Sequence, residues 1–177
     1  MAIHRLNHAV LYVRNVERSV AFYRDVLGFA AIEGMDGLRG AAFLRAPAST
    51  NDHDLGLFEI GDAAADSAAG RSSVGLYHLA WEVDTLADLE ELRGTLAQVG
   101  ALSGSSDLST TKSLYGHDPD GLEFEIAWIV PADRLDAAAL AGRSRIQPLD
   151  LAREIARYGA DTPGGFGISR AAVPTAG

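Results

Sequence analysis

The hydrophobic and polar residues in the first part of the chain form a recognisable series of elements. Residues 5–13 alternate loosely between apolar and polar, as a β-strand does, and residues 16–27 carry apolar side chains at helical spacing. Gly28 follows this helix and suits its C-terminal cap. Three short runs typical of strands come next, at 29–32, 40–45 and 55–60. This part of the chain therefore predicts the order β-α-β-β-β.

The same order begins again after a linker of small residues at 61–73, which offers little to bury. A strand is expected at 75–83, followed by a helix at 85–99. One face of this helix is apolar and is expected to join the core; its residues are Leu86, Leu89, Leu92, Leu96 and Val99. Further strands are expected near 101–103, 111–116 and 122–129. Because neither half offers a sheet with both faces covered, we expect the two halves to fold as one body.

These elements predict an α+β fold built from two tandem βαβββ modules, with an additional C-terminal segment. The modules cover about residues 4–62 and 74–130, and together they form a single domain of residues 1–131. The extension 132–177 holds short helical patterns at 132–141 and 148–158, and its Gly/Pro-rich end is expected to be partly disordered. This extension could pack on the sheet, form a dimer contact or close over a site.

Composition narrows the possible classes of function. The 177 residues are 47% hydrophobic, enough for a sizeable core, and the net charge of −9 argues against nucleic acid or an anionic membrane as a partner. The absence of cysteine excludes disulfides, thiolate metal ligands and a cysteine nucleophile. No segment resembles a signal peptide or a membrane span, so we expect a cytoplasmic protein.

Each module carries a histidine at a matching position. His8 lies in Asn-His-Ala-Val-Leu-Tyr-Val, and His78 lies in Tyr-His-Leu-Ala-Trp-Glu-Val, each in the first predicted strand of its module. A duplicated unit that places one imidazole per copy on a strand favours a metal site.

Carboxylates and a further histidine extend this candidate site. Side chains alternate across a strand, so His53 and Glu59 share a face if residues 53–59 are extended, and Glu123 shares a face with Glu125. The Asp-Pro-Asp-Gly segment at 118–121 is typical of a turn. The groups expected to converge in a cup formed by the two modules are His8, His78, Glu125, and one or both of His53 and Glu59.

Several segments together resemble the vicinal oxygen chelate superfamily, which includes glyoxalase I, bleomycin-resistance proteins and extradiol ring-cleaving dioxygenases. The matching segments are residues 7–13, 19–28, 75–83 and 112–126. The resemblance covers residues 4 to about 130, and it implies a cup-shaped mixed β-sheet with the helices outside. Within the superfamily, the chain is most similar to the extradiol dioxygenases.

The resemblance to extradiol dioxygenases implies a mononuclear Fe(II) held by His8, His78 and Glu125. Such an enzyme cleaves a catechol-like vicinal diol with O₂, so the implied partners are a small aromatic or diol substrate, O₂ and a second copy of the chain in a homodimer. His53 matches the acid/base histidine of the family, and Tyr115 matches the tyrosine that donates a hydrogen bond to a substrate oxygen.

One departure and two alternatives accompany this interpretation. Similar proteins often carry a further histidine upstream of the Ser-Leu-Tyr segment, where this chain has Leu108, and this departure indicates a shifted substrate or reaction. A glyoxalase-like lyase or isomerase would use Glu59 as a fourth ligand and hold Ni, Zn, Mn or Co. A non-catalytic resistance protein that binds a small molecule is the third hypothesis.

Overall fold

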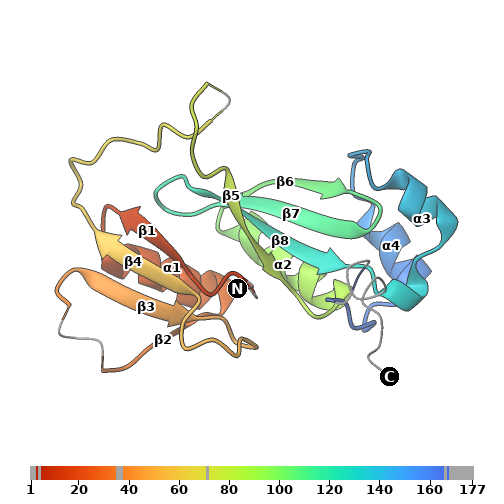
Figure 1. The fold of residues 1–177 in the computed structure, drawn as a ribbon, viewed down its shortest axis with the longest axis horizontal. Coiled ribbons are helices and arrows are strands. Elements are labelled where there is room, and N and C mark those ends of the chain that lie inside the picture. Colours follow the sequence, from red (N-terminus) through yellow and green to blue (C-terminus); the bar gives the residue numbers. More distant parts are fainter. Residues whose placement is uncertain (1–2, 4, 35–37, 71, 166, 168–177) are drawn as a thin grey trace. The chain divides into compact units, whose positions relative to one another are not determined.

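The computed structural model describes residues 3, 5–34, 38–70, 72–165 and 167. They form two compact units (Figure 1). Unit 1 comprises the described residues within 1–68 and 118–122, and unit 2 comprises those within 69–117 and 123–177. Each unit holds one four-stranded sheet. The single domain over 1–131 stays a prediction.

Unit 1 has the predicted β-α-β-β-β order. Its elements are β1 (Ala9–Val13), α1 (Val16–Leu27), β2 (Ala30–Ala31), β3 (Ala41–Arg45) and β4 (Leu55–Glu59). The strand order in the sheet is β1-β4-β3-β2, with β1 parallel to β4 and the other pairs antiparallel. Helix α1 crosses from β1 to β2 at the opposite edge, and the two antiparallel steps to β3 and β4 then bring β4 beside β1 in the parallel direction.

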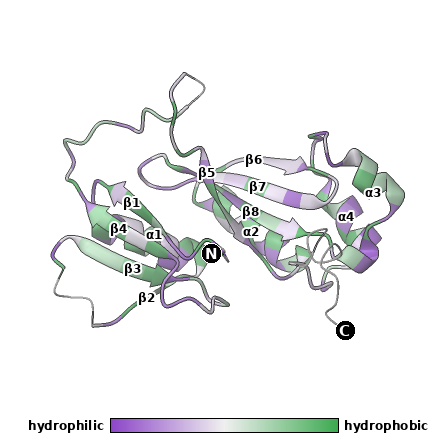
Figure 2. Ribbon diagram, viewed as in Figure 1, coloured by the Kyte–Doolittle hydropathy of each residue, from purple (hydrophilic) through white to green (hydrophobic). Residues whose placement is uncertain are grey.

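The ends of α1 and the packing of its sheet follow from local sequence. The side chain of Asn15 accepts a hydrogen bond from the backbone of Arg18, and Gly28 adopts a left-handed conformation (φ +75°) that closes the helix, as predicted. Helix α1 contacts β3 and β4, where Leu55 and Leu57 are fully buried. Figure 2 shows hydrophobic residues along β3 and β4.

Unit 2 repeats this topology and adds the C-terminal segment. Its elements are β5 (His78–Glu82), α2 (Leu86–Gln98), β6 (Leu102–Asp107), β7 (Thr111–His117), β8 (Glu123–Ile129), the 3₁₀ turn η1 (Ala132–Arg134), α3 (Ala137–Gly142) and α4 (Leu151–Tyr158). The strand order β5-β8-β7-β6 repeats that of unit 1, again with one parallel pair, β5 and β8. The duplication and the α+β fold class are therefore confirmed.

Helix α2 and strand β6 differ in detail from their predicted bounds. Thr85 and Asp88 form a capping box at the start of α2, but the helix ends at Gln98. Val99 is therefore the cap residue and is 53% exposed, so including it in the core stripe was wrong. Strand β6 runs to Asp107, beyond the expected 101–103, because it pairs with β7 as far as Lys112.

The C-terminal segment packs on unit 2, which is one of the three possibilities that the sequence left open. Helix α4 contacts α2, and the buried ammonium group of Lys112 on β7 lies 2.9 Å from a carboxylate oxygen of Glu154 on α4. Gln147 and Asp107 exchange two backbone hydrogen bonds of 2.8 and 3.0 Å.

The segment that follows α4 is tied to unit 2 by polar contacts. The indole nitrogen of Trp128 donates to the carbonyl oxygen of Thr162, and the backbone N–H of Gly164 donates to that of Asp84. Within the end that was expected to be partly disordered, residues 166 and 168–177 lie outside the described residues. Among the described residues, no helix has the length and apolar character that crossing a membrane requires.

Candidate metal centre

His78 and Glu125 lie on neighbouring parallel strands, and their side chains meet. In the register of β5 and β8, His78 is opposite Glu123, and Ala80 is opposite Glu125. The Nε2 atom of His78 lies 3.1 Å from Oε2 of Glu125, and both side chains are partly buried. Two of the predicted ligands are therefore close together within unit 2.

The second oxygen of Glu125 is held by a hydroxyl group. Ser113 is fully buried on β7, and its Oγ–H donates a short hydrogen bond of 2.5 Å to Oε1 of Glu125. With Oε1 bound in this way, Oε2 faces the imidazole of His78. Sequence analysis did not single out Ser113, because the contact depends on how β7 and β8 align.

The other nitrogen of His78 faces a second carboxylate. Nδ1 of His78 lies 3.5 Å from Oε1 of Glu123, and both atoms are buried without a hydrogen-bond partner among the described residues. The remaining oxygen of Glu123, Oε2, lies 3.8 Å from Nε2 of His117. The imidazole of His78 thus lies between two glutamates, one near each ring nitrogen.

Tyr115 lies on the same sheet beside this pair. It is opposite Glu125 in the register of β7 and β8, and its ring centroid is 6.1 Å from that of His78. Its hydroxyl oxygen lies 2.9 Å from Oγ of Ser106 on β6. Three predicted site residues, His78, Glu125 and Tyr115, are therefore brought together in unit 2.

Ser106 is a second site residue that sequence analysis missed. The expected strand near 101–103 stopped short of it, whereas β6 extends to Asp107 and pairs Ser106 with Ser113. Residues 102–107 read Leu-Ser-Gly-Ser-Ser-Asp, which has no apolar alternation, so the sequence offered no signal that Ser106 lies beside Tyr115. Leu108, where similar proteins were expected to carry a histidine, lies just past β6 in the turn to β7.

His8 and His53 come together in unit 1. Their ring centroids are 4.5 Å apart, and the ring of Phe43 packs edge-on against His53 at 5.1 Å. Nδ1 of His8 lies 2.7 Å from the side-chain oxygen of Asn7, and Nδ1 of His53 lies 3.0 Å from a carboxylate oxygen of Asp52. Each imidazole therefore has its Nδ1 occupied, which leaves Nε2 for a ligand or a proton.

The parallel strand pairs of the two sheets are equivalent, so the positions of the candidate carboxylates in the two units can be compared. Ala80 is opposite Glu125 in unit 2, and the corresponding pair in unit 1 is Val10 and Gly56. The position of Glu125 is therefore taken in unit 1 by Gly56, which has no side chain that could bind a metal.

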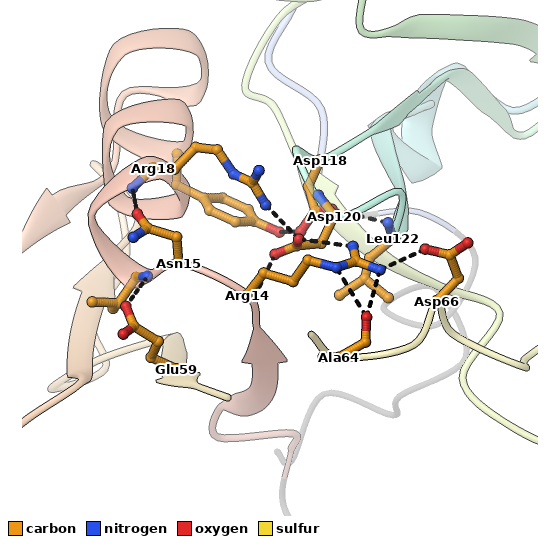
Figure 3. Close-up of polar contacts among 11 residues, drawn as sticks. Arg14, Asn15, Arg18, Glu59, Ala64, Asp66, Asp118, Asp120 and Leu122 are labelled. Atoms are coloured by element: carbon orange, nitrogen blue, oxygen red, sulfur yellow. Dashed lines mark hydrogen bonds and ion pairs between the residues drawn. The ribbon is translucent and has the colours of Figure 1, made fainter. Parts of the chain in front are cut away.

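Glu59 lies three residues beyond Gly56 on β4 and contacts the start of α1. Its Oε2 accepts a 3.0 Å hydrogen bond from the backbone N–H of Val16 (Figure 3). A carboxylate at a helix N-terminus satisfies an otherwise unpaired N–H and interacts favourably with the helix dipole. This contact gives Glu59 a structural role at α1.

The Asp-Pro-Asp-Gly segment forms the predicted turn. Oδ1 of Asp118 accepts hydrogen bonds from the backbone N–H groups of Asp120 and Leu122, and Gly121 has φ +81°. Burial is the main cause that raises the pKa of Asp118 above its usual value. The hydroxyl of Tyr23 donates to Asp118 at 3.4 Å, and burial raises the pKa of this phenol well above 10.0.

Asp120 joins two arginines in a contact that sequence analysis did not predict. Its Oδ1 pairs with Arg18 at 2.5 Å and with Arg14 at 3.2 Å (Figure 3). Arg14 also donates to the carbonyl oxygen of Ala64 and to Asp66. These charges neutralise one another, so we assign the cluster a structural role.

The unit 2 pair suits a divalent cation. Two donors each about 2.1 Å from one ion and at right angles lie about 3 Å apart, which matches the 3.1 Å between His78 and Glu125. The buried Nδ1 of His78 also suits an imidazole that ligates through Nε2. Among the described residues, no group of three or more His, Asp or Glu side chains forms a complete metal site, and the full ligand set stays a prediction.

Curated relatives include dioxygenases. The chain is 31% identical over 124 residues to a catechol-2,3-dioxygenase of Bacillus subtilis (strain 168), covering 68% of this chain and 40% of that protein. Metapyrocatechase 2 of Cupriavidus necator is 29% identical over 100 residues, covering 56% and 27%. A manganese-dependent 2,3-dihydroxybiphenyl 1,2-dioxygenase of Geobacillus genomosp. 3 is 28% identical over 134 residues, covering 72% and 38%. The chain spans less than half the length of each of these relatives.

Solved structures share the fold. A glyoxylase/bleomycin resistance protein/dioxygenase domain from Frankia sp. EAN1pec has a TM-score of 0.58 at 23% identity, covering 71% of this chain and 92% of that one. A lactoylglutathione lyase from Agrobacterium tumefaciens has a TM-score of 0.52 at 21% identity, covering 72% and 95%. Residues 5–126 match one family model, so the chain belongs to the Glyoxalase/Bleomycin resistance protein/Dioxygenase superfamily.

Proposed function

We propose that the function is that of a metal-dependent dioxygenase of the extradiol type, which cleaves a catechol-like vicinal diol with O₂. The observation that carries this proposal is the meeting of His78 and Glu125 at 3.1 Å, with Tyr115 beside them. The dioxygenase names of two curated relatives support the same reaction class.

His8 is proposed as the third ligand. It precedes β1 as His78 begins β5, so the two histidines hold equivalent positions in the duplicated sheets. His8, His78 and Glu125 would hold Fe(II) with two imidazoles and one carboxylate, and the ion would supply open coordination positions for a diol and O₂. Mn(II) is the alternative metal, because one relative is named as manganese-dependent.

Tyr115 is proposed to orient the substrate. The hydroxyl pair of Tyr115 and Ser106 holds the phenol oxygen in place at 2.9 Å. When Ser106 donates in this pair, the phenolic proton of Tyr115 is free to donate to a substrate oxygen. The hydroxyl group would therefore distinguish a diol from an apolar ring of the same size.

His53 is proposed to transfer the proton. Its Nδ1 lies beside Asp52, which orients the ring, and imidazole is a common acid/base group in enzymes. A proton taken from the substrate hydroxyl at Nε2 of His53 could then be returned later in the reaction. In this proposal His53 acts as the acid/base group, whereas the neighbouring His8 is a metal ligand.

The four-ligand lyase has less support. Glu59 accepts a hydrogen bond from Val16, and the register of β4 gives the position equivalent to Glu125 to Gly56. We therefore propose three protein ligands, and Glu59 is left out of the set. A non-catalytic binding protein would have no need of the paired His78 and Glu125.

Anaerobic reconstitution with Fe(II), followed by catechol and air, tests the proposal. We expect a yellow ring-fission product from the unmodified chain and none from the Glu125→Gln variant, since the amide is a poor ligand. A parallel reconstitution with Mn(II) identifies the preferred metal.

The Glu59→Gln variant separates the dioxygenase from the lyase. It should bind the metal and form product at rates within about twofold of the unmodified chain. A chain that binds Fe(II) but yields no product from catechol or a substituted catechol would contradict the dioxygenase, and loss of metal in Glu59→Gln would favour the four-ligand lyase.

A further inference from the structure

Both candidate ligands of unit 2 have a neighbouring side chain that could orient them. These neighbours, Ser113 and Glu123, belong to strands β7 and β8 and were assigned no role in the proposed reaction. The inference below rests on the proposed metal centre and deepens it.

The first neighbour acts on Glu125. A carboxylate has two oxygens, and each could approach an ion. The short hydrogen bond from the buried hydroxyl of Ser113 occupies Oε1, while Oε2 faces Nε2 of His78. Glu125 is thus prepared to bind through one oxygen, and its χ angles are restrained before any ion arrives.

The second neighbour acts on His78. An imidazole that binds a metal through Nε2 must be neutral and must carry its proton on Nδ1, and a buried N–H needs an acceptor. Oε1 of Glu123 lies 3.5 Å from Nδ1, and neither atom has a hydrogen-bond partner among the described residues. A small movement to about 3 Å would satisfy both atoms with one hydrogen bond.

We propose that Ser113 and Glu123 are positioning residues of the metal centre. Ser113 selects the free oxygen of Glu125, and Glu123 selects the tautomer of His78 that exposes a lone pair on Nε2. Both then lower the cost of ordering the ligands, and groups of this kind typically contribute 10-fold to 100-fold to metal affinity.

Titration of the full chain with Co(II) tests both assignments, with the visible absorption spectrum and calorimetric affinity as readouts. Ser113→Ala should bind Co(II) about 10-fold to 100-fold more weakly, because Glu125 is no longer ordered before the ion binds. Its absorption spectrum should also change, because Glu125 is free to bind through both oxygens. Ser113→Thr keeps the hydroxyl and should restore the affinity and the spectrum.

The same titration applies to Glu123. Glu123→Ala should weaken binding by a similar factor, whereas Glu123→Gln keeps an acceptor oxygen and should lose only a few-fold. His117→Gln is the matched control, since Nε2 of His117 lies 3.8 Å from Oε2 of Glu123, the oxygen that does not face His78. The affinity of this variant for Co(II) should equal that of the unmodified chain.

The outcomes separate this inference from the metal centre itself. If the unmodified chain does not bind Co(II), the metal centre and the positioning residues both fail. If it binds Co(II) and His78→Gln abolishes binding, but Ser113→Ala and Glu123→Ala bind as tightly as the unmodified chain, only the positioning roles are overturned. Ser113→Thr and Glu123→Gln preserve polar packing, so the comparison stands even where an alanine variant fails to fold.

Discussion

The side chain of Asp118 is buried yet accepts two hydrogen bonds from the backbone of its own turn. Burial penalises the charged carboxylate and raises its pKa, and the backbone N–H groups oppose that shift only in part. A group whose pKa is higher in the folded state than in the unfolded state binds its proton more tightly when folded. The stability of the protein therefore falls as the pH rises through the interval between the two pKa values.

Replacing Asp118 with Asn tests this pH dependence. The amide oxygen can accept the same two hydrogen bonds, and no charge remains to be buried. We expect Asp118→Asn to be at least as stable as the unmodified chain at pH 7, and its relative advantage to shrink as the pH falls below about 4, where the unfolded carboxyl is also protonated. Urea unfolding from pH 3 to pH 7 measures this, and a variant that is less stable at pH 7 would contradict the assignment.

At the scale of elements, a buried ion network joins α4 to the sheet of unit 2. The ammonium of Lys112 lies 2.6 Å from Asp107 and 2.9 Å from Glu154, and the side chains of Lys112 and Glu154 are 1% and 0% exposed. Arg153 lies at the outer side of this network, 3.0 Å from Glu154. Charges this deep are tolerated only when they are paired, and we expect this pairing to contribute to the position of α4.

Breaking one partner of this network should be costly. Lys112→Met removes the buried cation beside Glu154 and leaves this buried carboxylate paired with the exposed Arg153 instead. We expect the variant to lower the free energy of unfolding by about 3–5 kcal/mol. The double variant Lys112→Met with Glu154→Leu should recover most of that loss, because two apolar side chains can pack where the pair was. Denaturant unfolding measures the cycle.

Arg153→Ala is the control for the network, since this side chain is 61% exposed. Its effect should stay within about 1 kcal/mol. A Lys112→Met variant that is no less stable than Arg153→Ala would show that α4 is held mainly by apolar contacts.

At the scale of the whole molecule, the proposed metal centre should couple metal binding to stability. A ligand that binds only the folded chain raises the free energy of unfolding by about 2.7 kcal/mol when its concentration is 100 times its Kd. We expect Fe(II), added under anaerobic conditions, to raise the Tm of the chain and a chelator to reverse the rise.

Single substitutions then identify the ligands. His8→Gln and His78→Gln should each abolish most of the rise in Tm, whereas Glu59→Gln should keep it. Differential scanning calorimetry with and without metal measures the shift, and a full rise in the His8→Gln variant would remove His8 from the ligand set.

The order of elements and the duplication were predictable because they are local properties. Helical spacing, Gly28 as a cap and the repeated strands are each visible within a dozen or so residues, and the structure confirms them. The prediction that His8 lies within its strand was wrong, because β1 begins directly after it at Ala9. Of the candidate ligands of unit 2, His78 lies in the repeated motif, whereas the assignment of Glu125 depended on the resemblance to the extradiol dioxygenases.

Contacts between strands and helices distant in the sequence were decided only by tertiary structure. The register of β4 places Gly56 opposite Val10, at the position that Glu125 has in unit 2. Glu59 instead accepts a hydrogen bond from the first residue of α1, Val16. A shift of one residue in register moves every side chain of a strand to the other face, and alternation alone does not fix the register.

The sequence by itself therefore determined the fold family and the residue types available for chemistry, because periodicity and motif spacing are written along the chain. Only the folded chain decided that Ser113 holds Glu125, that Ser106 meets Tyr115 and that Lys112 is buried against Glu154. Each of those pairs joins residues from different elements. Their meeting depends on strand register and helix packing, which are set by the whole core and not by any short segment.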